Sequence, residues 1–367
     1  HRQVLTPLAY TIPELLAGYS DPPDYINGKD GTHYDNLDLQ KKYGLLLTNA
    51  LNAWADTLLP DHTSAAISDT EANRKTSFTF PLGYSRPRLL GASGLAVLGS
   101  GTGSTQSELY LIYKGTIGHQ HQDALSILWY AHGLEVLSES TYRGPVESRH
   151  FRPWYRSAPA HHTVIVDERP QFSQRKDFAI PAENSLWDNS GSFNNQGKLL
   201  TFDTTLPEAQ FVEAEFVRAY QPLVSQYQRT VAYVPLEQGD GYVIDIFRVR
   251  GGKKHDYILR GGLNQPHTAK VSQSGIPFEK DLYDHVGIHT KYDLSRAVEL
   301  GFEHANGVNM EANILQPVNG TVSLLEGEAP AIRRNGTAPY FILRNQSQEG
   351  ETGALGSTFV VVYDVSK

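Results

Sequence analysis

Histidine and carboxylate side chains gather in two short segments of this sequence. The first segment is Gly118-His119-Gln120-His121-Gln122-Asp123, and the second is Ala160-His161-His162-Thr163. If the first segment is a strand, His119, His121 and Asp123 share one face, because alternate residues of a strand point the same way. Imidazoles with a carboxylate suit Zn²⁺, and imidazoles can also surround an anionic substrate. One histidine alone would be an ordinary strand residue, but several histidines and a carboxylate in two short segments favour a metal-binding or substrate-binding site.

The stretch between the two histidine segments carries residues that could hold an anionic sugar chain. Guanidinium groups pair bidentately with carboxylate or sulfate, and Trp and Tyr rings offer faces for sugars. An ordinary solvated loop explains the same composition equally well. The residues are Tyr142, Arg143, Arg149, Arg152, Trp154, Tyr155 and Arg156.

The elements that must position these residues are mostly strands. From about residue 75 onward, short β-forming runs alternate with Gly, Pro, Asn and Asp, which is typical of a large antiparallel β-sandwich. Before them, residues 37–59 carry apolar side chains at helical spacing and Pro60 ends the run. We therefore predict a mainly β fold preceded by a short helical segment. The predicted division is a helical segment over 1–75 and a β-sandwich domain over 76–367.

Composition excludes several classes of protein. The chain has 367 residues, a formal net charge of −8 and no cysteine, so disulfides and thiolate metal sites are absent. No apolar run approaches the ~20 residues that a membrane-spanning helix needs. No basic block indicates nucleic-acid binding. The chain begins with His1 and has no leader-like segment, so we expect a processed or truncated chain from a secreted or periplasmic protein.

Taken in order, these motifs resemble the heparinase II/III-like C-terminal domain. That domain belongs to polysaccharide lyases that act on heparin, heparan and alginate. The resemblance covers about residues 80–265 and implies an α/α toroid followed by a β-sandwich, with the active site between them. The segments that carry it are Gly118–Ser126, Tyr130–Gly133, Trp154–Ser157 and Ala160–Asp167, with a further similar stretch from Asp245 to Tyr257.

The resemblance also implies roles for the histidines. His119 would contact the substrate, while His121 and His161 would hold a Zn²⁺ that is structural or supports the site. The family's acidic ligand follows the next strand, and here Glu139 is the candidate, displaced by one position. A shift of one residue turns a strand side chain to the opposite face, so the third ligand is the weakest part of this assignment.

Further catalytic and substrate-binding candidates follow from the same resemblance. The run Asp30–Asn36 is similar to the family's segment near a catalytic tyrosine, which makes Tyr34 a candidate proton donor and base. A glycine turn before the helix is the plain alternative. Tyr155 is the third catalytic candidate, beside His119. The predicted substrate-binding residues are Arg143, Arg149, Trp154, Arg156 and His162, of which His162 stands where the family has Asn.

The sequence thus predicts a polysaccharide lyase that cleaves a uronic-acid-containing anionic polysaccharide by β-elimination. Too few residues precede the β region for a toroid, so we expect only part of the enzyme here, completed by a separate helical chain or domain, and we consider a homo-oligomer as well. Three alternatives stay open. They are a non-catalytic carbohydrate-binding scaffold, a uronyl C5-epimerase on the same fold, and a cupin-like enzyme with iron or manganese.

Overall fold

The structure is a computed structural model, and it divides the chain into two compact units, His1–Leu58 and Leu59–Lys367. The boundary predicted at 75/76 lies outside the described residues. No helix in the described parts of the chain is long and apolar enough to span a membrane. The described residues are 11–68, 70, 83–91, 93–113, 121–141, 153–171, 197–263, 265–294, 297–315, 320–331 and 336–367.

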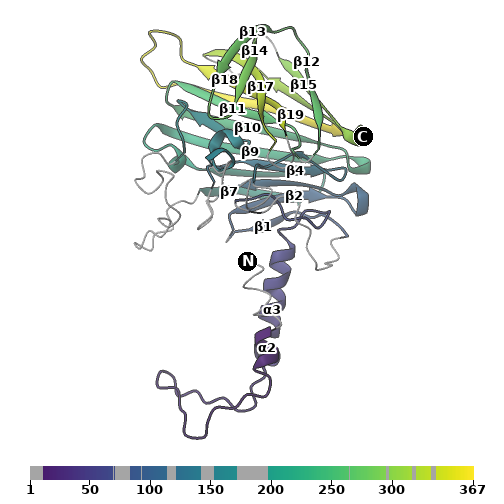
Figure 1. Cartoon of the computed structure of the whole chain (residues 1–367), viewed down its shortest axis with the longest axis vertical. Helices are drawn as coiled ribbons and strands as arrows, with labels where there is room; N and C mark the ends of the chain where they lie inside the picture. Colours follow the sequence, from purple (N-terminus) through teal and green to yellow (C-terminus); the bar gives the residue numbers. More distant parts are fainter. Residues whose placement is uncertain are drawn as a thin grey trace. The chain divides into compact units, whose positions relative to one another are not determined.

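The first unit contains two described helices, α2 (Ile12–Leu15) and α3 (Leu39–Ala55) (Figure 1). The carboxylate of Asp38 accepts the Lys41 N–H at 2.9 Å, which satisfies one of the unpaired donors at the start of α3. The helix was expected to reach Leu59 but ends at Ala55. After Ala55 the backbone bonds no longer follow the helix, since the Leu58 N–H donates to the Ala55 carbonyl at 3.0 Å and the Leu59 N–H donates to the Thr63 carbonyl at 2.9 Å.

The second unit begins with a five-stranded antiparallel meander in the order β1-β2-β3-β4-β5. Each strand pairs with the next along the chain, and the long connection from β3 to β4 contains the first histidine segment. The strands are β1 (Arg88–Leu90), β2 (Leu95–Ser100), β3 (Ser107–Ile112), β4 (Ile127–Ala131) and β5 (Leu134–Leu137).

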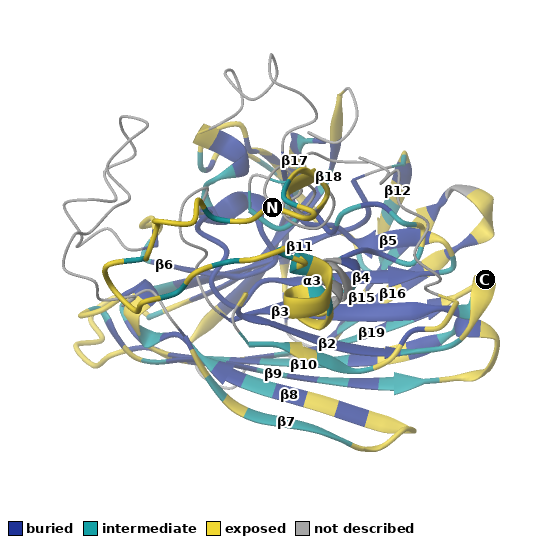
Figure 2. Cartoon of the chain, turned by 90° about the horizontal axis from the view of Figure 1, so that it is seen from below, coloured by how far each residue is buried: buried dark blue, intermediate teal, exposed yellow. Residues whose placement is uncertain are grey.

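An eight-stranded antiparallel sheet follows, in the order β12-β15-β16-β19-β10-β9-β8-β7. Buried and exposed residues alternate along its strands, as Figure 2 shows for β8, because one face packs on the core and the other faces outward. Its strands are β7 (Lys198–Leu206), β8 (Ala209–Glu215), β9 (Val224–Pro235), β10 (Gly241–Gly251), β12 (His267–Val271), β15 (Val298–His304), β16 (Asn309–Leu315) and β19 (Gly356–Ser366).

A six-stranded antiparallel sheet completes the unit, in the order β13-β14-β17-β18-β11-β6. Its edge strand β6 directly follows the second histidine segment, so this sheet positions that segment. The strands are β6 (Val164–Val166), β11 (Lys254–Arg260), β13 (Ile276–Asp281), β14 (Gly287–Asp293), β17 (Thr321–Pro330) and β18 (Thr337–Gln346).

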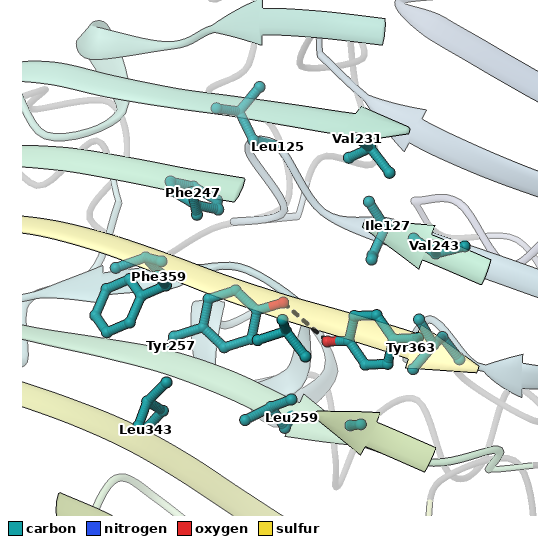
Figure 3. Packing of buried hydrophobic residues seen from close by; sticks show 14 of the residues in the cluster. Leu125, Ile127, Val231, Val243, Phe247, Tyr257, Leu259, Leu343, Phe359 and Tyr363 are labelled. Atoms are coloured by element: carbon teal, nitrogen blue, oxygen red, sulfur yellow. Dashed lines mark hydrogen bonds between the residues drawn. The ribbon is translucent and has the colours of Figure 1, made fainter. Parts of the chain in front are cut away.

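One large apolar core joins the three sheets. It takes Leu111 from the five-stranded sheet, Phe247 from the eight-stranded sheet and Leu343 from the six-stranded sheet. Figure 3 shows part of this core, where the hydroxyls of Tyr257 and Tyr363 meet at 2.8 Å. The prediction of a mainly β, antiparallel sandwich preceded by a short helical segment is confirmed. That the helices are the end of a toroid stays a prediction.

Candidate functional site

The structure brings the described part of the first histidine segment against the second. His121 and Asp123 lie between β3 and β4, and His161 lies between a short 3-10 turn (Ala158–Ala160) and β6. The ring centroids of His121 and His161 are 5.2 Å apart. All three side chains are buried. Residues about forty positions apart in the sequence therefore form one cluster.

The first segment is not a strand over its described residues. Residues 121–126 form a loop, in which the Ser126 N–H donates to the Asp123 carbonyl at 2.9 Å. Leu125 has a φ of +59°, a left-handed backbone conformation that a strand cannot contain. We call residues 121–126 the first histidine loop and residues 161–163 the second. Alternation along a strand therefore does not decide where His121 and Asp123 point.

Glu139 reaches the histidines in spite of its displaced position in the sequence. One of its carboxylate oxygens contacts Nδ1 of His161, and the other accepts a hydrogen bond from the Ser126 hydroxyl. Residues 138–140 lie beyond the end of β5, so the alternation of strand faces no longer applies to them. The structure thus brings together His121, Glu139 and His161, the three residues predicted to bind a metal.

Burial sets the electrostatics of this cluster. It raises the pKa of Asp123 to about 7, an effect that His161 opposes and that Glu139 increases. It lowers the pKa of His162 well below its ordinary value, and the nearby charges of Arg260 and Arg229 lower it further. Asp123 therefore takes up a proton much more readily than an exposed aspartate does, and His162 stays neutral.

The donor types of the cluster fit Zn²⁺. Nε2 of His161 is buried and finds no hydrogen-bond partner among the described residues, and a buried nitrogen of this kind is costly unless something binds it. Imidazole and carboxylate are ordinary zinc ligands. No group of three or more histidine, aspartate or glutamate side chains in the described ranges is arranged to hold a metal ion, however. Zinc binding stays a prediction.

The aromatic candidates lie inside the protein. Trp154 and Tyr155 are 0% and 2% exposed, so neither presents a free ring face in the described structure. The Tyr155 ring lies 5.4 Å from the His121 ring, and the Trp154 ring lies 6.2 Å from that of Tyr340. These two ring contacts are packing contacts, and the substrate and catalytic roles predicted for Trp154 and Tyr155 stay predictions.

Arg156 and His162 also lie next to the cluster. The carbonyl of Arg156 accepts the Gln122 N–H at 2.9 Å, which joins its segment to the first histidine loop, and its side chain is partly exposed. His162 is 1% exposed. Their substrate-binding roles are untested. Three other predicted residues, His119, Arg143 and Arg149, lie outside the described residues.

Tyr34 belongs to the first unit. Its N–H donates to the Asp21 carboxylate at 2.7 Å, which fixes the backbone of this turn. Nζ of Lys42 lies 4.9 Å from the centre of the Tyr34 ring, a cation–π contact. Its predicted catalytic role stays a prediction.

Sequence reasoning missed the arginine that contacts both histidine loops. Nη1 of Arg229 on β9 donates to the carbonyl of Leu125 and to that of His162, each at 2.5 Å. A signal was present in the sequence. Arg229 has the same strand parity as the buried Tyr227 and Val231, and a charge at an inward-facing position needs buried partners.

Comparisons with known proteins agree with this fold. The family model described as "Heparinase II/III-like, C-terminal" matches residues 85–298. The solved "Heparinase III-BT4657 gene product" has a TM-score of 0.60 and 13% identity, covering 89% of this chain and 47% of its own. Heparan sulfate lyase HepC from Pedobacter heparinus has a TM-score of 0.57 and 12% identity, covering 89% and 48%.

The structural likenesses cover only part of the similar proteins. This chain spans about half the length of the two solved structures. At such low identity, structural likeness shows the fold and leaves the chemistry to the residues of the site. A comparison with curated protein sequences found no match.

Proposed function

Because this chain belongs to the heparinase II/III-like C-terminal family, we propose that it forms the β-sandwich side of the active site of a polysaccharide lyase. The proposed substrate is an anionic polysaccharide that contains uronic acid. The solved structures of a heparinase III and a heparan sulfate lyase support this substrate class. The observation that carries the proposal is the convergence of His121, Glu139 and His161 from three separate segments.

The proposed reaction is β-elimination, in which atoms and charge balance within the substrate. A base removes the proton at C5, the electron pair forms a double bond between C4 and C5, and the C4–O4 bond breaks. An acid then protonates the leaving oxygen, and a cationic or hydrogen-bonding group stabilises the charge that builds on the carboxylate. We assign the substrate contact to His119 and the proton transfers to Tyr34, with Arg143, Arg149 and Arg156 as partners of the anionic groups.

We further propose that His121, Glu139 and His161 hold Zn²⁺. Bound there, the ion would supply positive charge that fixes the histidine loops and supports the site. The contact of Glu139 with Nδ1 of His161 supports His161 as a ligand, because carboxylates commonly orient metal-binding imidazoles and the buried Nε2 finds no partner among the described residues. Elemental analysis of the purified protein tests it, and His161→Ala should lose the metal. His289→Ala, at an exposed position of β14, is the control.

The experiment that tests the lyase is incubation with alginate, heparan, hyaluronan, chondroitin and ulvan. The longest natural form of the protein should produce an unsaturated uronate, visible by its ultraviolet absorbance, from at least one polymer, and His119→Ala should abolish that product. Exchange of the C5 proton without unsaturated product would show that the protein is an epimerase and not a lyase. Binding without either reaction would leave a carbohydrate-binding scaffold.

A polymeric substrate of this kind lies outside the cytoplasm, so we propose that the protein is secreted or periplasmic. The absence of cysteine is compatible with this but does not decide it. Fractionation of the source cells tests the location, and recovery of the protein in the cytoplasmic fraction would contradict it. The helical part of the active site would come from a further domain or a separate chain.

A further inference from the structure

A buried ion pair lies beneath the two histidine loops. Arg229 on β9 and Asp245 on β10 are both fully buried. Nε of Arg229 donates to one carboxylate oxygen of Asp245 at 2.8 Å, and Nη2 donates to the other at 2.5 Å. This two-pronged pairing fixes the plane of the guanidinium group as well as its position. A buried ion pair is often no more stabilising than apolar packing, so its presence suggests another role.

The third nitrogen of the same guanidinium group reaches the site. Nη1 of Arg229 donates to the carbonyl of Leu125, in the first histidine loop, and to the carbonyl of His162, in the second, each at 2.5 Å. Leu125 is two residues from Asp123, and His162 is next to His161. One nitrogen atom therefore bridges the two backbone segments that carry His121 and His161.

Neighbouring hydroxyl groups hold Asp245 in place. The Tyr257 hydroxyl on β11 donates to the same oxygen of Asp245 that Nη2 of Arg229 contacts. The Tyr363 hydroxyl on β19 lies 2.8 Å from that of Tyr257, as Figure 3 shows. The position of the guanidinium group is thereby determined by strands of two sheets rather than by the loops. The packing of these strands therefore fixes where Arg229 meets the two histidine loops.

We propose that Arg229 is a positioning residue for the candidate active site, with Asp245 as the group that orients it. The inference rests on the proposed function, in which the two histidine loops form the metal-binding part of the site. Lysine could keep the charge pairing with Asp245, but its single ammonium group has no planar set of donors to reach both carbonyls as well. The loops also bond directly, since the Thr163 hydroxyl donates to the Ala124 carbonyl at 2.6 Å. Loss of Arg229 should therefore shift the loops rather than separate them.

A second buried pair provides a matched control. Arg344 on β18 donates to Asp256 on β11 from Nε at 2.7 Å and from Nη2 at 2.6 Å, the same two-pronged arrangement. Within the described residues, Arg344 makes no hydrogen bond to either histidine loop. Arg344→Lys and Arg229→Lys thus weaken the same kind of pair, but only the second also removes contacts with the loops.

The experiment compares the two lysine variants of the full chain by urea unfolding, by zinc titration and by NMR of the histidine ring nitrogens. Both variants should unfold at lower urea concentration than the wild type. Only Arg229→Lys should weaken zinc binding, by about 10- to 100-fold, and shift the ring resonances of His161 and His162. Asp245→Asn, which keeps the shape of the carboxylate, should give a smaller shift of the same resonances and serves if Arg229→Lys does not fold.

The outcomes are decisive in each case. If Arg229→Lys leaves the histidine resonances as they are in the wild type, or if Arg344→Lys moves them equally, Arg229 has no positioning role. If the wild type binds no zinc, the zinc proposal fails by itself, and the ring resonances measured without metal decide whether Arg229 positions the loops.

Discussion

Removal of His304 should change how the stability of the second unit depends on pH. His304 ends β15 and is 7% exposed, and its Nε2 accepts the Gly262 N–H at 3.1 Å. The next residue, Leu263, donates its N–H to the Ser138 hydroxyl at 2.9 Å, beside Glu139 of the site. His304 thus holds a segment that packs next to the histidine cluster. Burial, and then the neighbouring His267, lower the pKa of His304 to about 4.

The sign and size of the effect follow from this pKa. In the unfolded chain His304 takes up a proton near its ordinary pKa of 6.5, whereas the folded protein resists protonation until about pH 4. The unfolded state therefore binds more protons between these values, and the free energy of unfolding falls as the pH falls from about 6.5 to about 4. A depression of this size corresponds to about 3 kcal/mol.

His304→Phe keeps an aromatic ring but removes both the titration and the acceptor of the Gly262 N–H. Above pH 7 the variant should be less stable than the wild type by about 1–3 kcal/mol, because a buried N–H loses its partner. This difference should shrink by about 3 kcal/mol toward pH 4, and disappear or change sign. Urea unfolding followed by tryptophan fluorescence at several pH values measures it.

Phe302→Leu is the matched control for His304→Phe. Phe302 is buried in the same strand, and its ring lies 6.0 Å from that of His267. The substitution removes packing but no titratable group, so its cost should be the same at every pH. A constant difference between wild type and His304→Phe from about pH 7.5 to about pH 4 would refute the reasoning.

Three further predictions concern other parts of the second unit. Gly101→Ala should cost about 3 kcal/mol or more, because its φ of +89° is strained for alanine and its methyl group would collide with a neighbouring backbone carbonyl. Gly103→Ala, at a φ of +54° with open space around it, should cost only about 1–2 kcal/mol, and equal costs in urea unfolding would contradict the argument. Gln210→Ala removes two buried bonds to the Gly99 backbone, of 2.9 and 3.1 Å, and should cost roughly 2–4 kcal/mol in the same assay; an unchanged unfolding midpoint would be the contrary result. Chelation of zinc should lower the Tm by roughly 3–5 °C if the metal is present at about 100 times its Kd, whereas His161→Ala should not respond.

Local patterns in the sequence were sufficient to predict the fold class and the family. The parity of Tyr227, Val231 and Tyr233 along β9 follows directly from the alternation of a strand, because neighbouring side chains point to opposite faces. The order of the motifs was sufficient for the heparinase II/III-like C-terminal family, which the match over residues 85–298 confirms. These properties depend on neighbours in the chain, so the sequence alone contains them.

The same patterns misled where the chain is irregular. The shared face of His121 and Asp123 depended on a strand there, but Leu125 has a left-handed backbone and the segment is a loop. A displacement by one position cast doubt on Glu139, yet it contacts His161, because the chain leaves β5 before reaching it. Alternation assumes an extended backbone, and it has no predictive value where the strand has ended.

Only the tertiary structure decided which distant residues meet. Arg229 bonds to the carbonyl of Leu125, 104 positions earlier in the chain, and Gly262 bonds to the ring of His304, 42 positions later. Both contacts depend on how three sheets pack around one core, and this packing is a sum over many side chains rather than a property of any local segment. The sequence alone could name the histidines, but the protein needs its whole sandwich to bring them together.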